Sequence, residues 1–224
     1  MTDLARRLVA EALGTGLLVA TVVGSGIMAD RLTDDGALAL LANALPTGAV
    51  LIVLVNVLAP ISGAHFNPAI SLVMTLRRAL PLHVAALYVL AQLAGAVLGT
   101  MLAHAMFALP LLEASRHVRT GSSQWLAEAV ATFGLVAVII GGIRFQPTAV
   151  PWLVGLYISA AYWFTASTSF ANPAVTIARA LTDTFSGIRL IDAPAFIVAQ
   201  LAGALCAWAF AGWLWEPQPH EDQA

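Results

Sequence analysis

Two long stretches without any charged residue, each containing the tripeptide Asn-Pro-Ala, limit most strongly what this chain can fold into. The first runs from Ala37 to Leu76, 40 residues, and the second from Phe145 to Ala178, 34 residues. A helix crosses the hydrocarbon core of a bilayer with about 20 residues, so each stretch must span the membrane once and then re-enter it. Irregular backbone at membrane depth persists only where it lines water or is buried in protein. The pattern therefore predicts a pore or binding cavity at the two tripeptides.

Composition indicates a multi-pass membrane protein. Hydrophobic residues make up 60% of the 224 residues and charged residues 10%, a balance that is not typical of a soluble domain. The net charge of -2 offers nothing to nucleic acid. No set of nucleophile and base is indicated, and the histidines are too scattered for a metal site. We therefore expect no enzyme activity, no catalytic residue, no metal, no cofactor and no nucleic acid partner.

Hydropathy predicts an all-α membrane protein with six transmembrane helices and two re-entrant half-helices. The spans are expected near 8–29, 38–58, 83–107, 126–144, 151–168 and 194–215. The half-helices start at the tripeptides and are expected at 67–76 and 172–182. The residues at 216–224 are expected to form a solvated, disordered tail.

The two halves of the chain carry the same features in the same order, which indicates an internal repeat. Each half has a span containing Glu (Glu11 or Glu128), a second span, the tripeptide, and a span containing Gln. The units are 1–112 and 125–215, and a loop at 113–124 joins them. Because each unit has an odd number of spans, the second enters the membrane from the opposite side. This is an inverted repeat, with its site near the midplane.

An even number of spans places both termini on the same side of the membrane. The ten basic residues, all arginines, divide five to five between the two sides. Two of the outer five lie on the longest loop, and Arg179 lies within a re-entrant segment. The positive-inside bias counts mainly the arginines of short loops near span ends, so these three weigh little. We expect both termini to be cytoplasmic.

The tripeptide suits the start of a helix at membrane depth. Asn is a favoured N-cap and Pro is favoured at the first helical position. Two such helix starts facing one passage would each contribute roughly half a positive charge, which repels cations, while Asn amides could donate hydrogen bonds to neutral solutes. The predicted pore residues are Asn67, Pro68, Ala69, Asn172, Pro173 and Ala174.

Taken together, Ser-Gly-Ala-His-Phe-Asn-Pro-Ala at 62–69, the second Asn-Pro-Ala, and the paired Glu11 and Glu128 resemble the aquaporin and glycerol-facilitator family. The resemblance covers nearly the whole chain. It implies a right-handed bundle of six helices with two half-helices, set in the lipid bilayer. It also implies a homotetramer with one pore in each subunit and passive flow in both directions.

The selectivity filter that the resemblance implies departs from the usual family pattern. Most members follow the second tripeptide with Arg, where this chain has Val175. By family spacing, the other filter positions are Thr47, Ala160 and Ser169. All four side chains are small. We therefore expect a wide filter that passes solutes larger than water.

An open filter after Asn-Pro-Ala-Val is similar to bacterial aquaporins associated with arsenic resistance. That resemblance alone implies passage of arsenite, as neutral As(OH)3, and of methylated arsenicals, with glycerol and water. It also implies location in the bacterial inner membrane. Two alternatives stay open: a glycerol and water facilitator without a metalloid role, and a proton-coupled secondary transporter that uses Glu11 and Glu128.

Four polar residues are assigned to the surroundings of the pore. Glu11 and Glu128 are predicted to accept hydrogen bonds from loop amides, and His65 to brace its loop rather than to gate the pore. Arg179 lies four residues after Val175, about one helical turn outward. It either supplies in the outer vestibule the charge that the filter lost, or interacts at a half-helix C-terminus with free carbonyls or Asp183.

Overall fold

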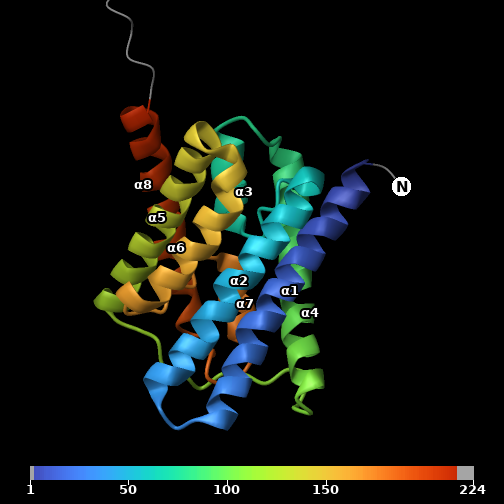
Figure 1. The fold of residues 1–224 in the computed structure, drawn as a ribbon, viewed down its shortest axis with the longest axis vertical. Helices are drawn as coiled ribbons and strands as arrows, with labels where there is room; N and C mark the ends of the chain where they lie inside the picture. Colours follow the sequence, from blue (N-terminus) through green and yellow to red (C-terminus); the bar gives the residue numbers. More distant parts are fainter. Residues whose placement is uncertain (1–2, 216–224) are drawn as a thin grey trace, which may run out of the picture.

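The computed structural model describes residues 3–215, which fold into a bundle of helices (Figure 1). The elements are α1 (Asp3–Leu32), α2 (Gly36–Ser62), α3 (Pro68–Leu76), α4 (Leu82–Met106), α5 (Ser122–Phe145), the short 3-10 helix η1 (Pro147–Ala149), α6 (Val150–Phe164), α7 (Pro173–Arg179) and α8 (Ala193–Trp215). The predicted all-α fold is confirmed, with α3 and α7 as the two half-helices. The expected tail at 216–224 lies outside the described residues.

Five of the helices are long and apolar enough to cross a membrane, namely α1, α2, α4, α5 and α8. The sixth predicted span, α6, has only 15 helical residues and stops at Phe164, short of the expected 168. The helix ends there because Thr165 is extended, with φ of -111° and ψ of 135°, and in the loop beyond it Thr168 and Ser169 adopt left-handed backbone angles, with φ of 62° and 50°. A loop with such angles cannot continue a right-handed helix.

The half-helix α7 also ends earlier than predicted, at Arg179 instead of residue 182. Beyond it, the backbone pairs with the loop that joins the two halves of the chain. The Ser115 N–H donates to the Ala180 carbonyl at 3.1 Å, and the Glu113 N–H donates to the Leu181 carbonyl at 3.0 Å. These bonds satisfy carbonyls that a helix end leaves free, and they fold the connecting loop across the end of α7.

Helix packing is matched between the two halves. In the first half α1 packs against α4, and in the second half α5 packs against α8. A Cβ atom at Gly95 of α4 would overlap the carbonyl oxygen of Ala12, and one at Gly203 of α8 would overlap that of Ala129. Small residues allow such close backbone approach in membrane bundles. The matching contacts support the repeat boundaries inferred from the sequence, which stay a prediction.

This close approach predicts that Gly203→Val destabilises the protein strongly. The added side chain would force α8 away from α5, and overpacking of this kind costs about 1–3 kcal/mol or more. The matched control is Gly212→Val on the same helix, where no atom lies within 4 Å of an added Cβ. Thermal unfolding in detergent should show a clearly lower melting temperature for Gly203→Val only. Equal melting temperatures for both variants would contradict the packing argument.

Candidate functional site

The two half-helices begin side by side, because the tripeptide asparagines hold each other's loops. The side-chain oxygen of Asn67 accepts from the N–H two residues later at 2.9 Å, and that of Asn172 does the same at 2.9 Å, so each caps its own helix. The Asn67 amide donates to the Ala171 carbonyl at 2.7 Å. The Asn172 amide donates to the Phe66 carbonyl at 2.8 Å. An amide nitrogen carries two hydrogens, so each asparagine keeps one donor for the space beside it.

Glu11 supports the first of these loops from α1. The carboxylate is fully buried. One of its oxygens accepts from the Ser62 hydroxyl at 2.6 Å and from the His65 N–H at 3.0 Å. The other accepts from the Phe66 N–H at 2.7 Å and from the Gln92 amide at 2.8 Å. Four donors satisfy the buried negative charge without a cation.

Glu128 of α5 does the same for the second loop and is also fully buried. Its carboxylate accepts from the N–H groups of Phe170 and Ala171, each at 2.9 Å, and from the Gln200 amide at 2.6 Å. Ala171 has a left-handed φ of 48°, which is unfavourable for a residue with a side chain. The carboxylate therefore compensates for strain at the point where the second tripeptide begins.

His65 contacts the first half-helix and α4. Its Nδ1 lies 3.1 Å from the Ser71 hydroxyl, and its ring meets the Tyr88 ring edge-on at 5.4 Å between centroids. His65 also lines the cavity described next. These contacts fit the brace that the sequence suggested, and the role stays a prediction.

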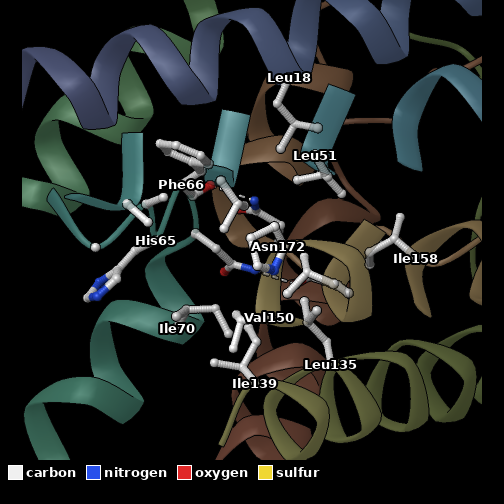
Figure 2. Close-up of a pocket in the computed structure, with 18 of the residues that line it drawn as sticks. Leu18, Leu51, His65, Phe66, Ile70, Leu135, Ile139, Val150, Ile158 and Asn172 are labelled. Atoms are coloured by element: carbon white, nitrogen blue, oxygen red, sulfur yellow. Dashed lines mark hydrogen bonds between the residues drawn. The ribbon is translucent and has the colours of Figure 1, made fainter. Parts of the chain in front are cut away.

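A cavity of about 570 Å³ lies between the helices, and both tripeptide asparagines line it. Loop residues 63–66 and 169–171 belong to the lining. In Figure 2 Asn172 lies at the centre of the cavity, among apolar side chains. That apolar lining includes Leu18, Leu51, Leu135, Ile139 and Ile158. The lining thus combines a few polar groups with many apolar side chains, as a passage for partly apolar neutral solutes requires.

Three of the four predicted filter residues line this cavity: Thr47, Ser169 and Val175. All three are buried. The Thr47 hydroxyl donates to the Asn43 carbonyl at 2.8 Å, so its oxygen can act only as an acceptor, with the Tyr162 hydroxyl 3.4 Å away. The Ser169 hydroxyl has no hydrogen-bond partner among residues 3–215. Both hydroxyls can therefore interact with a solute.

The structure corrects the prediction for the fourth filter residue, Ala160. Ala160 is exposed on the outside of α6 and does not line the cavity. Ile158 and Tyr162 line it instead, and the Tyr162 hydroxyl lies 3.4 Å from that of Thr47. Two residues along a helix correspond to a rotation of about 200°, so a two-residue error in spacing turns the predicted side chain outward. The filter region therefore contains an aromatic hydroxyl beside the small residues.

Arg179, the last residue of α7, lines the cavity and is only 2% exposed. It does not pair with Asp183, which binds Arg116 instead at 2.6 Å. The backbone N–H of Arg116, together with its guanidinium, holds the pKa of the Asp183 carboxyl below its usual range. Arg179 donates from Nε to the Ser186 carbonyl, and its guanidinium carbon lies 3.4 Å from the centre of the Phe170 ring.

Tyr162 and Phe170 are site residues that the sequence analysis missed. The signal for Tyr162 is its spacing of four from Ile158 on one helix face. The signal for Phe170 is its place two residues before the second tripeptide. Phe66 directly precedes the first tripeptide, so an aromatic residue lies close to both. Neither spacing predicts the cavity without knowledge of where α6 ends.

Comparisons with known proteins agree with this geometry. The family model described as Major intrinsic protein matches residues 1–144 and again 141–223. The aquaglyceroporin AqpS of Rhizobium meliloti (strain 1021) is 66% identical over 215 residues, which cover 96% of this chain and 92% of that protein. Aquaporin NIP1-1 of Zea mays is 28% identical over 92% of this chain and 73% of that protein. The X-ray structure of the aquaglyceroporin from Plasmodium falciparum covers 94% of this chain and 96% of that chain, with a TM-score of 0.75 and 22% identity, a likeness in fold.

Proposed function

Because this chain belongs to the major intrinsic protein family, we propose that it is a passive transmembrane channel for small neutral solutes such as glycerol and water. Members of this family are channels and not enzymes, so the chain is not an enzyme. The observation that carries the proposal is the cavity lined by the two asparagines that cap the half-helices, together with a few other polar residues and many apolar side chains.

Neutral solutes can exchange their hydration shell for groups in this cavity. The free amide hydrogens of Asn67 and Asn172 donate to solute oxygens, and the hydroxyls of Thr47 and Ser169 add donors and acceptors. The apolar lining suits the carbon backbone of a polyol. Cations have no such exchange, since no acidic side chain of residues 3–215 lines the cavity.

We extend the proposal to trivalent metalloid hydroxides, with arsenite and methylated arsenicals as the solutes. Arsenite is present at neutral pH as As(OH)3, which resembles glycerol in its size and in the display of its hydroxyl groups. Val175 and Ser169 keep their part of the lining small. A methyl group on arsenic would face the apolar lining. The alternative within this class is a glycerol and water facilitator without a metalloid role.

A proton-coupled transporter is the alternative of another class, and the two buried glutamates argue against it. Neither Glu11 nor Glu128 lines the cavity. Every carboxylate oxygen of both residues already accepts at least one hydrogen bond. A proton carrier must exchange its proton with solvent or substrate, and these carboxylates are occupied by loop amides.

The chain is a multi-pass membrane protein, and we propose that it acts as a homotetramer in the bacterial inner membrane with cytoplasmic termini. Large exposed apolar side chains occur on the outer faces of the spans, among them Leu90, Leu98, Leu156 and Val198. Such faces suit lipid or a neighbouring subunit. In Figure 1 the start of α1 and the end of α8 lie at the same end of the bundle, as a shared side for both termini requires.

Side-by-side uptake measurements test the proposed function. Purified protein in proteoliposomes should raise the permeability to water, glycerol and arsenite above that of empty liposomes, with weak temperature dependence and no need for an ion gradient. Stopped-flow light scattering measures all three solutes. Uptake of glycerol and water without arsenite would overturn the metalloid extension. Uptake that needs a pH gradient would overturn the channel.

A further inference from the structure

Arg179 is a buried cation without a carboxylate partner. Its side chain is among the largest that are fully enclosed. The ion pairs of residues 3–215 are Arg116 with Asp183 and Arg189 with Asp192, and neither involves it. Enclosing a charge without a counter-charge is costly, and ionisable residues inside a membrane protein mark functional positions by default.

Neutral groups fix the Arg179 guanidinium in one orientation. Nε donates to the Ser186 carbonyl, and the plane rests on Phe170. Phe170 is itself held by Glu128, which accepts its backbone N–H at 2.9 Å. One terminal nitrogen of Arg179, Nη1, has no hydrogen-bond partner in the described part of the chain. Arg179 also lines the cavity, so its charge lies beside the proposed path of the solute.

A second arginine reinforces the positive charge at this end of the cavity. The guanidinium carbon of Arg119, on the connecting loop, lies 5.2 Å from the centre of the same Phe170 ring. Arg119 donates to the Gly187 carbonyl at 2.7 Å and to the Ser167 carbonyl at 3.3 Å. Asp183 and Asp192, the acids that follow Arg179 in sequence, pair with Arg116 and Arg189, and Asp192 also accepts the backbone N–H of Arg119 at 3.0 Å. Two guanidinium groups thus contact the Phe170 ring, whose electron-rich face attracts cations.

The geometry points to Arg179 as the residue that excludes cations from this channel, in place of a charge directly after the second tripeptide. This inference rests on the proposed channel function. Val175 lies one turn, about 6 Å, nearer the tripeptide and stays small. The channel thereby separates two tasks: Val175 and its neighbours limit solute size, and Arg179, fixed on Phe170 and backed by Arg119, repels cations.

Cation leak through variants of Arg179 tests the inference. Proteoliposomes loaded with a pH-sensitive dye report proton leak, and potassium flux is followed in parallel with glycerol uptake. Arg179→Gln removes the charge and keeps a polar amide that can still donate hydrogen bonds. We expect its cation leak to rise roughly tenfold or more, the effect of lowering a barrier by about 1.4 kcal/mol, and by a larger factor than any change in glycerol uptake. Arg179→Lys should keep the leak low.

Matched variants keep the test decisive. Arg77→Gln removes an exposed arginine at the end of the other half-helix, α3, and should leave the leak unchanged. Val175→Arg added to Arg179→Gln should restore the barrier. If Arg179→Gln does not elute as a folded assembly, Arg179→Met is the second neutral variant, since its flexible chain packs on Phe170 without a polar partner.

The outcomes separate this inference from the proposed function. A folded neutral variant with the cation leak of the wild type and normal glycerol uptake would overturn the role of Arg179 and leave the channel intact. Failure of the wild-type protein to raise glycerol uptake above empty liposomes would overturn the channel itself.

Discussion

Val175→Arg is expected to lower permeability to glycerol and arsenite by roughly tenfold or more, a barrier increase of about 1.4 kcal/mol, and to lower water permeability less. Val175 is 4% exposed and lines the cavity beside the second tripeptide. A guanidinium there would extend into the passage, and the smallest solute loses least when a passage narrows. Stopped-flow uptake of the three solutes by one preparation measures the ratio directly.

The control for this prediction is Val175→Thr, which keeps the shape of the side chain and adds a hydroxyl. Its permeabilities to water, glycerol and arsenite should rank in the same order as those of the wild type. An equal loss of permeability to all three solutes in Val175→Arg would show that residue 175 is not at the selective constriction. The narrowest point of the passage would then lie elsewhere. Tyr162 and Thr47, with hydroxyls 3.4 Å apart, are the next candidates for it.

The half-helices could be predicted from the sequence because their signals are local. Asn67 and Asn172 cap the helices that follow them, as their residue type favours. The paired glutamates could be predicted because an acid in an apolar span needs buried donors, and the strained loops provide them. Both signals act within a few residues or repeat in the two halves of the chain.

The inward face of α6 could not be predicted in the same way. Placing Ala160 in the filter required counting back from Asn172 across a loop whose path is set by left-handed residues and by bonds to Glu128. An error of two residues there exchanged Ala160 for Tyr162. The partner of Arg179 was also beyond local reasoning, because the Ser186 carbonyl and the Phe170 ring come from different loops.

Glu128→Gln is expected to destabilise the folded protein by roughly 2–6 kcal/mol, since at least two buried donors, the new amide and the N–H that it faces, lack an acceptor and each costs about 1–3 kcal/mol. The new amide places a donor against the Phe170 N–H or, in its other orientation, against the Ala171 N–H and the Gln200 amide. The second tripeptide would lose its support, so uptake of all solutes should fall together with the folded fraction. Thermal unfolding and uptake by the same sample measure both quantities.

Glu113→Gln, an exposed acid on the connecting loop, is the matched control and should behave as the wild type. The comparison separates a supporting carboxylate from one that carries protons. A supporting carboxylate predicts that stability and uptake fall together, and that wild-type uptake ignores a pH gradient. If Glu128→Gln instead kept the wild-type melting temperature and lost only uptake driven by a pH gradient, Glu128 would be a proton carrier, and a passive channel could not describe this protein.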